Sequence, residues 1–296
     1  MNALAWAIDH AERGITAPAQ PAEADDFRAA TQRFLPDVRR AFDRIIMASD
    51  PELGLDSLLE CGALSAMLPE VNALVGFGDG EWRHKDVWKH TKQVVRQAEP
   101  RIEVRWAALL HDIGKVKTRT ISPDGEVHFF GHAEVGARMF DRLDRRLPIF
   151  APEPALKSSV RFLILHHLRA SQYESSWTDS AVRRFAREMG DELEDLFALS
   201  RADITTKRPE KKKKGLRQIS ELAERTERLR ELDAKVPPLP SGIGDDIMKT
   251  FGIPPSRKIG EIKKALEAAI DSGEIPSHQC SEFYLTFLRE NAARFF

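Results

Sequence analysis

The stretch that decides the fold is WAALLHDIGK, residues 106–115. Five apolar residues in succession predict a buried helix that leads directly to His111 and Asp112, and Gly114 is expected to stop it. An imidazole and a carboxylate at the end of a rigid, buried element are a donor mixture that suits first-row divalent ions. Taken alone, such a pair is more often an ordinary hydrogen-bonded His-Asp pair at a helix end than a metal site.

Apolar residues recur at helical spacing along most of the remaining chain, as at Leu193, Leu196 and Phe197. One segment breaks this pattern, because residues 119–130 alternate in polarity around the tight-turn sequence SPDG at residues 122–125. The sequence therefore predicts an all-α protein, with a multi-helix core, a short β-hairpin insertion, and helical regions on both flanks.

We predict that the chain divides into four parts, and proline-rich segments mark the first and the last boundary. Residues 1–24 read as a flexible lead-in, with helices beginning near Asp25, and residues 25–80 as a helical, neck-like region. A central domain is expected over residues 81–235. The segment VPPLPSG at residues 236–242 forbids helix continuation and opens a C-terminal helical region, residues 236–296.

Composition restricts the class of protein. The chain has 296 residues, 42% of them hydrophobic, which is sufficient for a core without disulfides, and its two cysteines are far apart. Because so few and so distant cysteines do not form a disulfide scaffold, a reducing cytoplasm is the expected location. No membrane span is expected, since the apolar runs are far shorter than the roughly 20 residues that one needs. The net charge of −1 makes any attraction to nucleic acid depend on local basic patches.

The heptapeptide LLHDIGK, residues 109–115, resembles the signature of the HD-domain metal-dependent phosphohydrolase superfamily. The resemblance implies that residues 81–235 form an HD domain. It also implies that a histidine on an earlier helix and an aspartate on a later one complete the metal site. His90 in VWKHT and Asp203 in SRADI occupy those positions.

Superfamily members that hold two metals suggest two more ligands. His132 lies in GHAEVG, and either His166 or His167 lies in the matching histidine pair. We favour His167, which leaves His166 as a neighbour or a substrate contact. Without a metal, His132 would be a hydrogen-bonded residue beside a turn, and the histidine pair would lie on a partly exposed helix face.

The resemblance implies one or two divalent metal ions as cofactors, with Mn, Ni, Co or Fe favoured and Mg also compatible. Metal-assisted hydrolysis would follow, with Asp112 bridging the ions. Lys115 would bind a substrate phosphate as a second catalytic residue. Its ordinary role would be that of a solvated lysine at a helix end.

The flanks have a resemblance of their own. Residues 45–55, 242–248 and 251–262 resemble the body and C-terminal regions of bacterial CCA-adding tRNA nucleotidyltransferases, so that about residues 40 to 275 are covered. The preceding residues contain neither the Gly-Ser nor the Asp-x-Asp pair of that family's nucleotidyltransferase head, so transfer of CMP and AMP is not expected. The implied substrates are nucleotide or RNA phosphoesters, including 2′,3′-cyclic phosphates.

Basic residues supply candidate phosphate contacts. Lys207 and Arg208 precede the lysine run of residues 211–214, and Arg183 and Arg184 form a second pair. The lysine run could equally be a solvated loop. Besides phosphohydrolysis, the sequence favours a non-catalytic body that binds tRNA or RNA and partners a separately encoded head. A nucleotide triphosphohydrolase is a further alternative, and the oligomeric state is open.

Overall fold

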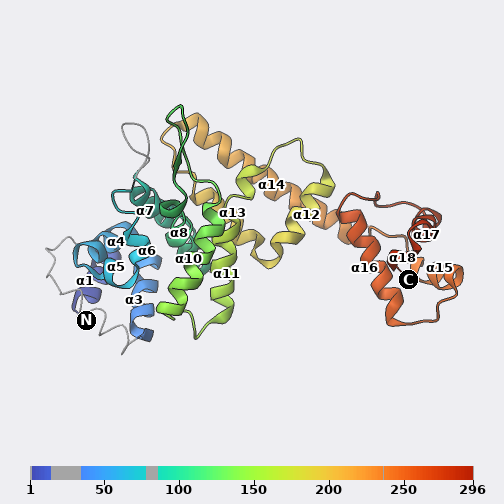
Figure 1. Cartoon of the computed structure of the whole chain (residues 1–296), viewed down its shortest axis with the longest axis horizontal. Helices are drawn as coiled ribbons and strands as arrows, with labels where there is room; N and C mark the ends of the chain where they lie inside the picture. Colours follow the sequence, from blue (N-terminus) through green and yellow to red (C-terminus); the bar gives the residue numbers. More distant parts are fainter. Residues whose placement is uncertain (1, 15–34, 78–85, 236, 296) are drawn as a thin grey trace. The chain divides into compact units, whose positions relative to one another are not determined.

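The computed structural model describes residues 2–14, 35–77, 86–235 and 237–295. Helices dominate these residues, and one two-stranded sheet accompanies them (Figure 1), which confirms the predicted all-α architecture with a small β insertion. The expected helix start near Asp25 lies outside the described residues. No described helix is both long and apolar enough to cross a membrane.

The elements follow one another along the chain in this order. The first half contains α1 (Asn2–Arg13), α3 (Leu35–Met47), α4 (Pro51–Glu60), α5 (Ala63–Met67), α6 (Pro69–Asn72), α7 (Val87–Gln97), α8 (Ile102–Leu110), α9 (Lys115–Thr118), β1 (Thr120–Ile121), β2 (Val127–His128) and α10 (His132–Arg146). The second half contains α11 (Pro154–His166), α12 (Asp179–Met189), α13 (Leu193–Ala202), α14 (Pro209–Lys235), α15 (Ile243–Phe251), α16 (Arg257–Asp271), α17 (Ser281–Glu290) and α18 (Ala292–Phe295). Two short 3-10 turns, η1 (Ala170–Gln172) and η2 (Gly190–Glu192), flank α12.

The chain forms two compact units. The first unit comprises residues 1–172 and 191–219, and the second comprises residues 173–190 and 220–296. Residues 173–190 and 220–235 belong to the second unit, although the sequence placed them before the boundary expected at residue 236. The physical reason is that α12 packs against α16 of the C-terminal region.

Helix α8 lies at the centre of the first unit, where it contacts α3, α7, α11 and α13. Every residue from Val104 to Leu110 is buried, because a helix with apolar side chains on all faces excludes water on all sides. Buried Arg105 donates to the carbonyls of Ala98 and Ile46, at 2.8 and 2.6 Å, so its guanidinium satisfies backbone acceptors at neighbouring helix ends. The predicted buried helix is confirmed, and it ends directly before His111 and Asp112.

The expected flexible lead-in is wrong for residues 2–13, which form α1. This helix packs against α3 and α4, and Ala7, Ile8 and Ala11 are buried in the contact. Nδ1 of His10 lies 2.7 Å from the Ser57 hydroxyl on α4. The helix is stabilised by this tertiary packing, because an isolated helix of about 12 residues is marginal in water.

The predicted hairpin is confirmed between α9 and α10. Strands β1 and β2 pair antiparallel, with Thr120 opposite His128 and Ile121 opposite Val127. Gly125, at φ +82°, donates its N–H to the Ser122 carbonyl at 2.9 Å and closes the turn. Only glycine adopts this backbone conformation without steric cost, which explains the turn position in SPDG.

The second unit has a separate apolar core, built by α15, α16 and α17. Its buried side chains are Leu239, Ile243, Ile247, Ile259, Ile262, Leu266, Ala269, Ile270, Ile275, Tyr284, Leu285, Leu288 and Phe295. The Tyr284 hydroxyl accepts from the N–H of Gln279 at 3.1 Å and lies within 3.2 Å of the carbonyls of Pro238 and Pro276. One buried hydroxyl thus links two connections of this unit, the one before α15 and the one between α16 and α17.

Candidate metal centre

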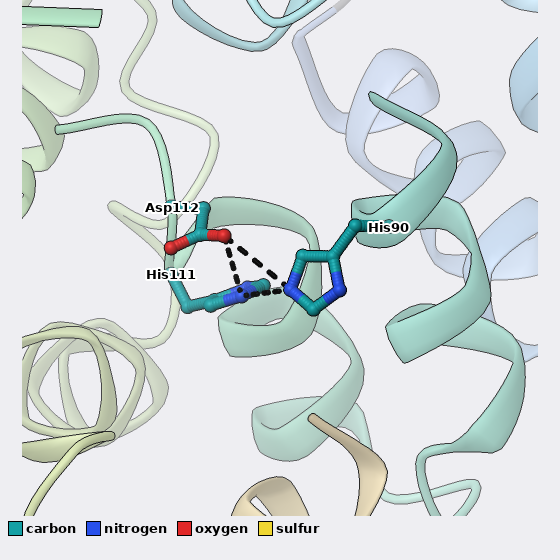
Figure 2. A group of neighbouring side chains, drawn as sticks. All are labelled: His90, His111 and Asp112. Carbon is teal, nitrogen blue, oxygen red and sulfur yellow. Dashed lines mark hydrogen bonds and ion pairs between the residues drawn. The ribbon is translucent and has the colours of Figure 1, made fainter. Parts of the chain in front are cut away.

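His111 and Asp112 follow α8 directly, and each is only 1% exposed. Figure 2 shows both side chains facing His90 of α7. The Nε2 atoms of His90 and His111 lie 3.3 Å apart, and Oδ2 of Asp112 lies 3.4 and 3.2 Å from them. These three ligand atoms are close enough to surround one ion.

Helix α7 positions His90 through its N-terminus. The side chain of Asp86 caps this helix by accepting from the N–H groups of Trp88 and Lys89. His90 lies one turn later, and its Nε2 is 3.0 Å from Oδ1 of Asp203, the residue that follows α13. Oδ1 of Asp203 is also 3.7 Å from Nε2 of His111, so the structure brings this predicted ligand to the same group.

A second group of potential ligands shares Asp112. Oδ1 of Asp112 lies 3.5 Å from Nε2 of His132, and Nε2 of His132 lies 3.1 Å from Nε2 of His167. His132 begins α10 and His167 follows α11. Of the two adjacent histidines, His167 points its Nε2 at this group, whereas the ring of His166 packs against Phe162.

Backbone carbonyls fix the tautomers of three of these histidines. Nδ1 of His111, His132 and His167 lies 2.7–2.8 Å from the carbonyl oxygen of the residue three positions earlier. A carbonyl oxygen only accepts, so Nδ1 carries the proton and the Nε2 lone pair faces the centre. Metal-binding histidines are oriented by hydrogen bonds of this kind.

Burial and charge set opposite protonation states within the cluster. Burial lowers the pKa of His90, but hydrogen bonds to Asp112 and Asp203 outweigh it and raise that pKa to about 9. Burial and the neighbouring His111 lower the pKa of His167 to about 4, and burial also lowers the pKa of His132. Burial opposes ionisation of Asp112, yet its histidine neighbours hold its pKa well below the ordinary value.

The residues fit a divalent metal on grounds of hydrogen bonding. Oδ1 of Asp112 is buried and accepts no hydrogen bond from any described residue. The neighbouring Nε2 atoms of His132 and His167 are both acceptors in their neutral form, so at 3.1 Å their lone pairs face each other without an intervening proton. A cation would satisfy all three acceptors at once. The imidazole and carboxylate donors also match the preference of first-row ions.

Lys115 contacts this cluster from α9. Its Nζ lies 2.7 Å from Oδ2 of Asp112 and 5.6 Å from the centroid of the Phe129 ring. Lys115, the residue predicted to contact a substrate phosphate, is therefore paired with Asp112, a carboxylate that a metal ion would also bind. Its role in phosphate binding stays a prediction.

The remaining predicted contacts lie elsewhere. Lys207 and Arg208 are exposed in the connection that follows Asp203, and residues 211–214 lie in the first turns of α14 rather than in a loop. Arg183 belongs to the second unit and forms a bidentate pair with Asp233, at 2.7 and 2.8 Å. Arg184, in the same unit, is half exposed with Nε 3.9 Å from Glu188.

Sequence reasoning missed several residues that support the centre. The Thr205 hydroxyl lies 2.8 Å from Nδ1 of His90, and the Phe129 carbonyl anchors His132. Gly114 was expected to stop the helix, but α8 already ends at Leu110, and Gly114 has a helical backbone conformation at the N-cap of α9. Its importance is steric, because a Cβ there would lie 2.1 Å from the His132 carbonyl oxygen. The glycine in HDIGK was therefore informative, but it indicates a close approach of two backbone segments rather than the end of the helix.

Comparisons with known proteins identify the domain that contains these residues. The HD domain family model matches residues 85–228. The chain is 30% identical over 250 residues to the A-adding tRNA nucleotidyltransferase of Deinococcus radiodurans, which covers 82% of this chain and 56% of that protein. It is also 30% identical over 262 residues to the CC-adding tRNA nucleotidyltransferase of Thermus thermophilus, covering 85% and 56%.

A shorter similarity concerns the multifunctional CCA protein of an Azoarcus species, with 36% identity over 116 residues, or 37% of this chain and 27% of that protein. The chain spans about half the length of the two tRNA nucleotidyltransferases that it matches over most of its own length. The HD match encloses all six candidate ligands, from His90 to Asp203. Residues 85–228 are thus an HD domain, within a chain whose body is similar to bacterial tRNA nucleotidyltransferases.

Proposed function

We propose that this chain is a divalent-metal-dependent phosphohydrolase that acts on nucleotide or RNA phosphoesters, with 2′,3′-cyclic phosphates as the first substrates to test. The observation that carries the proposal is the pair of ligand groups that share Asp112. His90, His111, Asp112 and Asp203 would hold one ion. Asp112, His132 and His167 would hold a second.

The chemistry follows from the cluster. A bound divalent ion supplies Lewis-acid stabilisation of phosphate charge and makes water more acidic. The backbone hydrogen bonds of His111, His132 and His167 hold their Nε2 atoms toward the centre without further reorganisation. Asp112 is nearly inaccessible to solvent, so its charge is weakly screened.

Lys115 would act on the substrate. Its ammonium neutralises part of the charge of Asp112 in the structure, and metal bound to Asp112 would compete for the same carboxylate. The released ammonium could donate to a phosphate oxygen, which is a common partner of lysine. Asp112 and Asp203 raise the pKa of metal-free His90 to about 9, so an ion bound at its Nε2 would replace this proton.

The test is hydrolysis by the protein loaded with Mn²⁺, Ni²⁺, Co²⁺, Fe²⁺ or Mg²⁺ in turn, with 2′,3′-cyclic nucleotides and a generic phosphodiester. Asp112→Asn keeps the side-chain volume but removes the shared charge, so we expect kcat to fall by about 1,000-fold or more, an order of magnitude associated with loss of a key charge-stabilising group.

The matched control is Asp141→Asn. Asp141 is an aspartate of α10 that pairs with Arg161 on the surface, at 2.8 and 3.0 Å, and it contacts none of the ligands. A partly exposed pair of this kind contributes about 0–1 kcal/mol, so this variant should retain activity. Undiminished hydrolysis in Asp112→Asn would refute the proposal.

A second candidate function is RNA binding without turnover. Lys207, Arg208 and residues 211–214 are all exposed, and none of them has an ion pair with another described residue. The similarity to proteins named for tRNA nucleotidyl transfer supports tRNA as the ligand. Under this proposal the chain binds tRNA for a separately encoded partner.

Salt-dependent tRNA binding separates the two candidates. Replacing Lys211 and Lys212 by Ala should weaken retention of tRNA and reduce the slope of affinity against salt concentration, because each neutralised phosphate adds to that slope. The control replaces Lys263 and Lys264 of α16 by Ala. Binding without hydrolysis under any metal favours the second candidate. Absence of binding at low salt removes it.

A further inference from the structure

The hairpin that connects α9 to α10 presents an aromatic stack to solvent. The rings of His128 and Phe130 are stacked and nearly parallel, with centroids 5.0 Å apart and an interplanar angle of 15°. Phe130 is 77% exposed, more than any other large hydrophobic side chain among the described residues. Because His128 covers one side, the exposed ring offers a flat apolar face backed by a second ring.

The neighbouring Phe129 has a structural role that Phe130 does not share. The Phe129 carbonyl holds His132, and its ring lies 6.2 Å from that of Phe77 and contacts Lys115. The guanidinium of Arg119 lies 5.9 Å from the centre of the Phe77 ring. These contacts attach the base of the hairpin to the body of the first unit. Apart from His128, Phe130 has no ring or cation contact with a described residue.

The stack belongs to the segment that leads directly into the candidate ligand His132. Only Gly131 separates Phe130 from His132, and a trans chain advances at most about 3.8 Å per residue between Cα atoms, so these two Cα atoms lie within about 7.6 Å. Backbone positions this close place both residues within the reach of one ligand that has a phosphate at one end and a planar group at the other. The segment leading into the hairpin is basic at Lys115, Lys117 and Arg119.

We propose that Phe130, supported by His128, stacks against the base of a nucleotide whose phosphate is bound at the metal centre. This inference rests on the proposed phosphohydrolase function and deepens it, because it requires a base on the substrate. Stacking on an aromatic ring contributes about 1–3 kcal/mol per base and tolerates any base, since every base has a π face. Basic residues beside the stack complement the phosphate charge.

The experiment compares a 2′,3′-cyclic nucleotide with glycerol 1,2-cyclic phosphate, which has the same five-membered cyclic ester and no base. Phe130→Ala should lower the ratio of kcat/KM for the nucleotide to kcat/KM for the glycerol ester by about 10-fold. The change should arise mainly from a higher KM for the nucleotide, and a 10-fold change corresponds to about 1.4 kcal/mol of lost stacking. Phe130→Trp should restore the ratio, because indole also stacks.

Ile121→Ala is the matched control. Ile121 lies on the other strand of the same hairpin and is 61% exposed, so its truncation removes exposed apolar surface without removing a ring. We expect the substrate ratio to stay at the value of the original protein. A Phe130→Ala variant that loses activity equally on both esters, or that leaves the ratio unchanged, overturns the proposal.

A direct binding measurement distinguishes failure of this inference from failure of the proposed function. If the original protein hydrolyses neither ester, calorimetry with Mn²⁺ compares binding of uridine monophosphate and ribose 5-phosphate. Tighter binding of the nucleotide that is lost in Phe130→Ala supports the stack even without turnover. Equal binding of both ligands, or binding of neither, refutes it.

Discussion

The two carboxylate oxygens of Asp112 face different groups of candidate ligands. Its Oδ2 contacts His90, His111 and Lys115, whereas its Oδ1 faces His132 without a hydrogen bond. A carboxylate divided in this way between two groups of ligands is suited to bridge two ions. Removing it would leave several buried histidines without their counter-charge, which costs more than the loss of one contact.

Gly114 gives a prediction about backbone packing. Gly114→Ala should lower the free energy of unfolding by about 3 kcal/mol or more, because the added Cβ would lie 2.1 Å from the His132 carbonyl oxygen and 2.7 Å from the Gly136 nitrogen. Neither backbone atom can rotate away as a side chain could. Urea unfolding followed by circular dichroism measures the loss.

Gly260→Ala of α16 is the control for this substitution. A Cβ there meets no atom within 4 Å, and the position is helical and exposed. Alanine should raise stability by about 1 kcal/mol, the difference in helix propensity between the two residues. Equal effects of the two glycine substitutions would contradict the steric explanation.

Asp195 gives a prediction about pH. Burial raises its pKa to about 6 from 3.8, although its ion pair with Arg101 opposes the shift. The folded state therefore binds this proton more tightly than the unfolded state. The resulting stability is fully present below about pH 4 and is lost as the pH rises through 6.

Asp195→Asn should remove that pH dependence. Between pH 4 and pH 7 the original protein should lose about 2–3 kcal/mol of stability relative to the variant, since each pKa unit corresponds to about 1.4 kcal/mol. Urea midpoints of both proteins, measured at matched pH values, give this difference. A difference that does not change with pH would show that Asp195 titrates normally.

At the scale of elements, the ends of helices hold the site together. His111, His167 and Asp203 each follow the last turn of a helix, whereas His132 begins one and His90 lies in the first turns of another. Helix ends carry backbone groups without intrahelical partners, so side chains there can turn toward a shared centre. The caps of these helices therefore affect the geometry of the ligands.

The contribution of a helix cap can be tested at Asp86, which caps α7, the helix that carries His90. Asp86→Ala removes the acceptor for two backbone N–H groups at 2.9 and 3.3 Å, and it should lower stability by about 1 kcal/mol. Asp86→Asn keeps an equally good cap and should cost much less. Thermal unfolding of the two variants measures the contrast. Similar losses of stability in both variants would mean that the charge of Asp86, rather than its hydrogen bonds to the helix end, stabilises α7.

At the scale of the whole molecule, metal binding should stabilise one unit selectively. The candidate ligands come from five separate segments, all within the first unit. Mn²⁺ at about 100 times its dissociation constant should add about 2.7 kcal/mol, because only the folded site binds it. The melting temperature should rise, and a chelator should reverse the rise.

Hydrogen exchange identifies the segments that bound Mn²⁺ stabilises. Peptides containing His90, His111, His132, His167 and Asp203 should gain protection with Mn²⁺, whereas peptides from α15 to α17 of the second unit should not. Asp112→Asn should reduce both the thermal shift and the added protection. Uniform protection along the chain, or an unchanged shift in the variant, would contradict metal binding at this centre.

The sequence alone determined the features that depend on local pattern. The apolar run before His111 predicted the buried α8, the SPDG turn predicted the hairpin, and LLHDIGK indicated the HD domain. These signals are readable because helical periodicity, glycine φ and the chemistry of metal donors belong to short segments. The order of His90, His132, His167 and Asp203 along the chain further nominated the residues that the fold brings together.

Only the tertiary structure decided what depends on contacts between distant residues. Helix α1 forms because Ala7 and Ala11 are buried against later helices, and Gly114 is needed because α10 approaches its backbone. The direction of the His167 ring, toward His132, depends likewise on how α10 and α11 pack. The sequence shows which ligand donors are present. The packing of helices decides which donor lone pairs point toward the same centre, because each arrangement of helices is stabilised by burial of surfaces from several elements at once.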